Sequence, residues 1–164
     1  PSLTSRLNGL AHRSPIRVVM DGRLRLPLTS ELVKTASDVP TILVTLKDAD
    51  KDRVKAFESA GIEVIRVKPD EEGRPSMSTV LNKLAKRGIT RLMVEGGSHL
   101  AGTLLRDGLV DRLAWFRAGG VMGADGIAAI SAFGVEKLAQ MPRFELLNQE
   151  KLGADFLDIW AIRA

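Results

Sequence analysis

The stretch RLMVEGGSHLAGTLL, residues 91–105, decides the fold because it joins a short apolar run to a helical pattern through two glycines. Residues 91–94 are predicted to form a strand. After Gly97, leucines at positions 100, 104 and 105 recur at helical spacing, and Gly108 is expected to end that helix. A strand that passes directly into a helix is the repeating unit of a parallel α/β sheet.

The same alternation precedes this stretch. Three β-branched runs, residues 16–20, 41–45 and 62–67, are predicted strands. Helices are predicted over about residues 50–60 and 76–87, where apolar side chains recur at helical spacing and Gly61 and Gly88 follow. Strands that alternate with helices predict a mostly parallel sheet with helices on both faces.

The pattern changes after residue 108. Residues 112–117 are a predicted strand, and a glycine-rich loop follows at 119–126. Residues 143–150 and 154–162 flank Leu152-Gly153 and predict an antiparallel hairpin at the C-terminal end. Neither an internal repeat nor a linker divides the chain, so we expect residues 1–164 to form one domain.

Composition narrows the possible functions. With no cysteine and two histidines, the chain offers no set of zinc ligands, so we expect no metal site and no zinc-dependent deamination. The net charge is +4, but basic residues are dispersed among acids and aromatics make up only 4%, so we expect no nucleic-acid partner. No apolar run approaches the roughly 20 residues that span a bilayer. We therefore expect no membrane partner and a cytoplasmic location.

The turn at Gly96-Gly97 is the candidate ligand-binding motif of this chain. Gly96 and Gly97 allow backbone N–H groups to approach a ligand, and the start of a helix favours phosphate. The spacing is not the Gly-x-Gly-x-x-Gly of dinucleotide folds, and Thr103 stands where a P-loop needs lysine. The spacing of the two glycines alone is equally consistent with a phosphate-binding turn and with a tight strand-to-helix turn that binds no ligand. Glu95 either faces the ligand crevice or interacts with the helix dipole.

Three segments resemble one family. Residues 92–111, LMVEGGSHLAGTLLRDGLVD, look very like the reductase domain of the bifunctional riboflavin-biosynthesis deaminase/reductase. Residues 1–6 and 15–27 resemble the family's Pro-x-Leu-Thr-x-Arg segment and its following strand. The resemblance implies an α/β fold like that of dihydrofolate reductase, with three αβα layers. It also implies NADPH-dependent reduction of 5-amino-6-(5-phosphoribosylamino)uracil to the ribitylamino product.

Site residues follow from the same resemblance, residue by residue. It implies substrate contacts from Leu3, Arg6 and Glu95. It places Gly22 at the cofactor, where the family often has Ser or Thr. It also assigns the cofactor-binding turn to seven consecutive residues, Gly97, Ser98, His99, Leu100, Ala101, Gly102 and Thr103. By position alone, Thr45 and Lys47 are candidates for the 2′-phosphate of NADPH. No general acid can be named.

The resemblance has further implications. It implies a homodimer and a zinc deaminase domain fused at the N-terminal side in the parent protein. The family's domain starts upstream of Pro1, so we expect residues 1–164 to be incomplete at the N-terminus and, alone, poorly stable and inactive. Three alternatives stay open: another NADPH-dependent pterin or dihydrofolate-type reductase, a nucleotide-binding domain without catalysis, and nucleic-acid binding, which the dispersed charge disfavours and which a steep salt dependence of binding would reveal.

Overall fold

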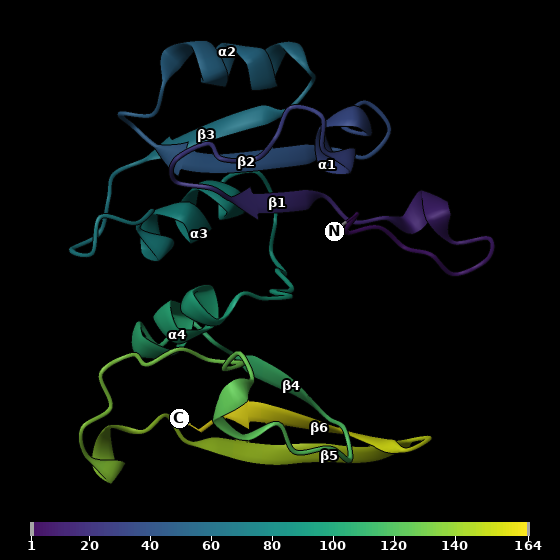
Figure 1. Ribbon diagram of the computed structural model, residues 1–164, viewed down its shortest axis with the longest axis vertical. Coiled ribbons are helices and arrows are strands. Elements are labelled where there is room, and N and C mark those ends of the chain that lie inside the picture. Colours follow the sequence, from purple (N-terminus) through teal and green to yellow (C-terminus); the bar gives the residue numbers. More distant parts are fainter. Residues whose placement is uncertain (1, 164) are drawn as a thin grey trace. The chain divides into compact units, whose positions relative to one another are not determined.

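The computed structural model describes residues 2–163, and the chain divides into two compact units, Pro1–Thr90 and Arg91–Ala164 (Figure 1). Each unit contains a three-stranded sheet. No helix in residues 2–163 is both long enough and apolar enough to cross a membrane.

The first unit contains the parallel sheet. Its strands are β1 (Arg17–Met20), β2 (Thr41–Leu46) and β3 (Glu63–Val67), in the order β1-β2-β3. Both neighbouring pairs are parallel. The helices are η1 (Ala11–Arg13), α1 (Glu31–Lys34), α2 (Lys51–Ser59) and α3 (Met77–Ala85). The three strands and two helices predicted from periodicity in this region are confirmed.

The two faces of this sheet are covered by different helices. The register places Val19, Leu43 and Val64 side by side on one face, where they pack with Val54 and Phe57 of α2. Met20, Val44 and Ile65 lie side by side on the other face. Figure 1 shows α2 and α3 on opposite sides of the sheet, so the predicted αβα layering is confirmed.

The second unit begins with α4 (Ser98–Arg106) and continues with β4 (Arg112–Arg117), β5 (Phe144–Leu152) and β6 (Asp155–Ile162). Two short 3-10 turns, η2 (Gly123–Asp125) and η3 (Leu138–Gln140), lie between β4 and β5. The sheet order is β4-β6-β5 and both pairings are antiparallel. The predicted C-terminal hairpin is confirmed. It turns at Gly153, whose φ of 65° favours glycine.

The strand predicted over residues 91–94 is wrong. These residues form neither strand nor helix, and they pair with no strand of either sheet in the described chain. Leu92, Met93 and Val94 are 37%, 75% and 40% exposed. A β-branched, apolar run becomes a strand only where a neighbouring strand accepts its hydrogen bonds, and sequence periodicity does not reveal that neighbour.

Candidate functional site

The site residues implied by the resemblance are divided between the two units. Leu3, Arg6 and Gly22 belong to the first unit, whereas Glu95 and residues 97–103 belong to the second.

The segment that carries Leu3 and Arg6 is held by short-range polar contacts. The Ser5 amide donates to Ser14 Oγ at 3.1 Å, and Ser14 Oγ in turn donates to the Ala11 carbonyl at 2.7 Å. Leu3 is half-buried and has a φ of 52°, a left-handed conformation that is unfavourable for a leucine. Arg6 is exposed, and no residue among 2–163 forms an ion pair with it. Its guanidinium is therefore available to a ligand.

Gly22 follows β1 at the carboxyl edge of the parallel sheet, where α/β proteins bind ligands. A Cβ at this position would lie 3.1 Å from Pro75 Cδ and 3.6 Å from Leu46 Cγ. The Gly22 carbonyl accepts from Thr45 Oγ1 at 3.0 Å and from the Leu46 amide at 3.3 Å. Close packing thus accounts for the glycine here, and without a side chain residue 22 could contact a cofactor only through its backbone.

The expectation that Thr45 binds a 2′-phosphate is wrong. Thr45 is fully buried, and its hydroxyl donates to the Gly22 carbonyl. Lys47 remains exposed after the end of β2.

Asp21 at the same edge was missed by sequence reasoning. Its side chain is buried, and Oδ2 accepts from the Leu26 amide at 2.7 Å. Its Oδ1 has no hydrogen-bond partner among the described residues and lies 3.8 Å from Arg25 Nε. The only sequence signal was the Asp-Gly pair that follows the apolar run 16–20, and such a pair is equally typical of a simple turn.

In the second unit, the glycine turn leads into α4. Gly96 has a φ of 126°, which favours glycine, and the Gly96–Gly97 peptide bond is cis. Gly97 is the N-cap of α4 and provides no side-chain cap. A Cβ built on either glycine would meet nothing within 4 Å. Among the described residues, no atom fills the space where these Cβ atoms would lie, which leaves room for a phosphate at the start of the helix.

The substrate candidate Glu95 and the remaining cofactor candidates differ in burial. Glu95 and His99 are exposed, and Ser98, Leu100 and Ala101 are half-buried. Gly102 and Thr103 are buried in packing instead. A Cβ on Gly102 would lie 3.0 Å from both the carbonyl oxygen and Oγ of Ser131.

Three hydrogen bonds hold this end of α4. Thr103 Oγ1 donates to the His99 carbonyl at 3.0 Å, within the helix. Ser131 donates to the Ser98 carbonyl from both its amide and its hydroxyl, each at 3.1 Å. Sequence reasoning missed Ser131, because it lies 33 residues from its partner.

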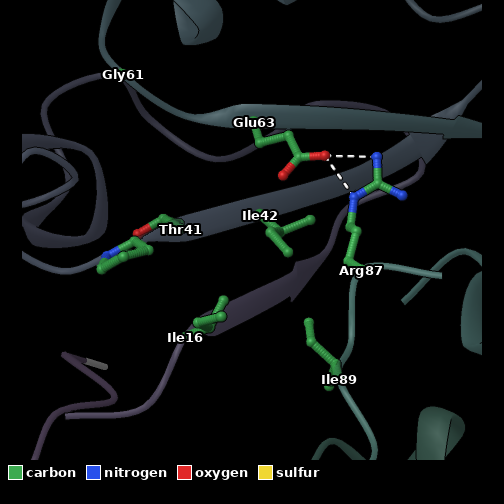
Figure 2. Close-up of a pocket in the computed structure, with 8 residues that line it drawn as sticks. Ile16, Thr41, Ile42, Gly61, Glu63, Arg87 and Ile89 are labelled. Atoms are coloured by element: carbon green, nitrogen blue, oxygen red, sulfur yellow. Dashed lines mark hydrogen bonds and ion pairs between the residues drawn. The ribbon is translucent and has the colours of Figure 1, made fainter. Parts of the chain in front are cut away.

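A cavity of about 270 Å³ lies elsewhere in the first unit (Figure 2). It is beside the amino ends of β2 and β3, opposite the edge that carries Gly22. Arg87 crosses it and donates from Nε to Glu63 Oε1 at 2.6 Å and from Nη1 to the Lys83 carbonyl at 2.9 Å. None of the predicted site residues lines this cavity. Its lining residues are Ile16, Pro40, Thr41, Ile42, Gly61, Glu63, Arg87 and Ile89.

Comparison with known proteins gives a consistent result. Residues 1–157 match the family model of the RibD C-terminal domain. The riboflavin biosynthesis protein RibD of Actinobacillus pleuropneumoniae is 31% identical over 158 residues, which cover 96% of this chain and 41% of that protein. The chain thus spans about 41% of the length of the RibD relatives.

Two further similarities extend the comparison. The 2,5-diamino-6-ribosylamino-4(3H)-pyrimidinone 5′-phosphate reductase of Aquifex aeolicus is 28% identical over 163 residues, covering 99% of this chain and 70% of that protein. The structure of Acinetobacter baumannii RibD superposes with a TM-score of 0.78 at 23% identity, covering 97% of this chain and 42% of that one. At this identity the superposition establishes the fold.

Proposed function

Because the chain belongs to the RibD C-terminal domain family, we propose that it reduces the ribosyl group of a phosphorylated 6-ribosylaminopyrimidine to a ribityl group in riboflavin biosynthesis. The family match over residues 1–157 carries this proposal. The favoured substrate is 5-amino-6-(5-phosphoribosylamino)uracil. The relatives named as 2,5-diamino-6-ribosylamino-4(3H)-pyrimidinone 5′-phosphate reductases make that compound the second candidate.

NADPH is the proposed cofactor, and it would supply the hydride. The residues present fit such a group: α4 starts without a side-chain cap, and the space beside Gly97 is open. The amides of the first helical turn can receive a pyrophosphate, and the partial positive charge at the helix start favours the anion. His99 is exposed on the same turn and can add a donor. Gly102 and Thr103 support this turn by packing.

Substrate binding is assigned to Leu3, Arg6 and Glu95. The exposed Arg6 guanidinium can donate two parallel hydrogen bonds to a phosphate or to pyrimidine carbonyls. Glu95 is exposed beside the glycine turn and can accept hydrogen bonds from hydroxyl or amino groups. These side chains position the reactants, and positioning is the protein's main contribution when a cofactor supplies the chemistry.

Assembly and location are also proposals. The resemblance implies a homodimer and a fused deaminase domain in the parent protein, and the absence of cysteine favours a cytoplasmic enzyme. The 41% share of the RibD relatives that this chain spans is compatible with a further domain.

The decisive assay follows NADPH oxidation by the full-length protein with three substrates: the aminouracil, the diaminopyrimidinone and dihydrofolate. We expect turnover with one or both phosphorylated pyrimidines. Turnover with dihydrofolate alone would favour a pterin-type reductase. NADPH binding without turnover of any of the three would favour a nucleotide-binding domain.

A further inference from the structure

Arg17 is a buried cation at the start of β1. It is only 2% exposed, and among residues 2–163 no carboxylate forms an ion pair with it. It is instead surrounded by oxygen acceptors from four segments of the first unit. Nε donates to Thr41 Oγ1 at 3.0 Å. Nη1 donates to Thr35 Oγ1 at 2.8 Å and to the Ser2 carbonyl at 3.2 Å. Nη2 donates to three carbonyls, those of Val39 at 2.9 Å, Thr35 at 3.0 Å and Leu32 at 3.2 Å.

This geometry uses the whole guanidinium. Burying a charge is costly unless hydrogen bonds replace its hydration, and arginine has five N–H donors in a fixed fork. A lysine ammonium has three donors at a single point, so it cannot reach the same acceptors on three sides. The site therefore selects arginine over a generic cation.

One of these bonds reaches the N-terminal segment that precedes β1. The Ser2 carbonyl belongs to the N-terminal segment, and the next residue is Leu3, with its left-handed φ of 52°. The bond from the Ser5 amide to Ser14 Oγ lies on the other side of Leu3. Two anchors thus flank a backbone conformation that a free leucine disfavours. Arg6 follows immediately and extends into solvent.

We propose that Arg17 is a positioning residue for substrate binding: its guanidinium holds the Ser2 carbonyl and thereby fixes the backbone from Leu3 to Arg6 before the substrate arrives. A segment that is ordered in advance loses less conformational freedom when a ligand binds. This inference rests on the proposed function, because Leu3 and Arg6 contact substrate only under that function.

The competing explanation is that Arg17 only joins β1, β2 and α1. Both roles make Arg17 important for stability, so a loss of stability does not separate them. They differ in what happens to residues 3–6 in a protein that is still folded, and in which kinetic constant changes.

The test compares Arg17→Lys and Arg17→Met with a matched control, Arg53→Met. Arg53 is in the same unit and also donates to backbone carbonyls, from Nε to Leu24 at 2.8 Å and from Nη2 to Leu26 at 3.0 Å. Among the described residues, its hydrogen bonds and its ring contact involve none of residues 2–6. Amide hydrogen exchange of residues 3–6 and steady-state kinetics are measured on each full-length variant.

In Arg17→Lys, we expect the amides of residues 3–6 to exchange about tenfold faster than in the wild-type protein. We also expect the KM for the pyrimidine to rise about tenfold, which is the size of effect that the loss of one charge-assisted hydrogen bond produces. The kcat should change less than KM, because the lost interaction serves binding in both ground and transition states. Arg17→Met should show larger effects in the same order, and if it does not fold, the lysine variant decides. Arg53→Met should leave exchange at residues 3–6 and the pyrimidine KM unchanged.

Unchanged exchange at residues 3–6 in folded Arg17→Lys would overturn the proposal. So would an equal increase in Arg53→Met, because the effect would then reflect general destabilisation. If the parent protein reduces none of the pyrimidines, the proposed function fails, while the exchange data still decide whether Arg17 orders this segment.

Discussion

Arg117 of β4 donates two hydrogen bonds to Asp158 of β6, from Nε to Oδ2 at 2.8 Å and from Nη2 to Oδ1 at 3.2 Å. Gln149 of β5 donates to the same Oδ1 at 2.8 Å, so one carboxylate connects all three strands of the sheet. Asp158 is 4% exposed. The hydrogen bond from Arg117, followed by that from Gln149, lowers the pKa of Asp158 despite its burial.

This lowered pKa predicts how stability changes in acid. A carboxyl group with a lower pKa in the folded state stabilises the fold above its unfolded pKa of about 3.9 and loses that contribution as pH falls through the folded pKa. Below about pH 4, the wild-type protein should therefore lose more stability than Asp158→Asn. Thermal unfolding at a series of pH values measures this difference. Asp155→Asn, at an exposed position of the same strand, is the control and should follow the wild type. Parallel pH profiles for wild type and Asp158→Asn would contradict the prediction.

The open space beside Gly97 yields a prediction about the cofactor. A Cβ at Gly97 meets nothing within 4 Å, and its φ of −67° suits any residue, so Gly97→Val should leave the melting temperature unchanged. If a pyrophosphate approaches this backbone, the valine side chain should weaken NADPH binding by at least about tenfold, or 1.4 kcal/mol. Fluorescence titration of the full-length protein measures the Kd. An unaltered Kd would remove Gly97 from the cofactor site.

Gly102 is predicted to behave in the opposite way. Its Cβ would lie 3.0 Å from two atoms of Ser131, and Ser131 is fixed by two hydrogen bonds to Ser98. Gly102→Val should therefore destabilise the fold by about 1–3 kcal/mol, as overpacking of a filled site does. Denaturant unfolding beside Gly97→Val measures the contrast. Equal free energies of unfolding for the two variants would contradict the prediction, because Ser131 would then move aside without loss of stability.

Sequence periodicity predicted the helices, whose hydrogen bonds lie within the segment, and the strands whose residues are buried along their whole length. The apolar run 41–45 became the central strand, and residues 98–106 became a helix whose Leu104 is buried. Residues 91–94 are as apolar as a strand, but no strand within residues 2–163 pairs with them. Pairing is a property of the fold and not of the run itself, so that prediction failed.

The site was less predictable than the fold for a related reason. Arg17 is flanked by apolar residues and gives no sequence signal for burial, because its acceptors come from residues 2, 32, 35, 39 and 41. The cluster around Asp158 likewise gathers residues from three strands. Arg6 and Glu95 were identified only by family resemblance, since an exposed arginine or glutamate looks like any solvated charge.

Arg6 gives the last prediction. It is exposed and, within residues 2–163, forms no ion pair, so Arg6→Ala should not change the stability of the first unit. If Arg6 clamps the substrate, the KM for the phosphorylated pyrimidine should rise, at a cost of about 1.5–3 kcal/mol for a charge-assisted contact, while NADPH affinity stays the same. Arg6→Lys should recover only part of this loss, because lysine cannot form two parallel hydrogen bonds. Arg13→Ala, an exposed arginine of the same unit, is the control and should have the wild-type KM. A normal KM for Arg6→Ala would show that Arg6 is a solvated loop cation, and substrate recognition would then have to come from other residues.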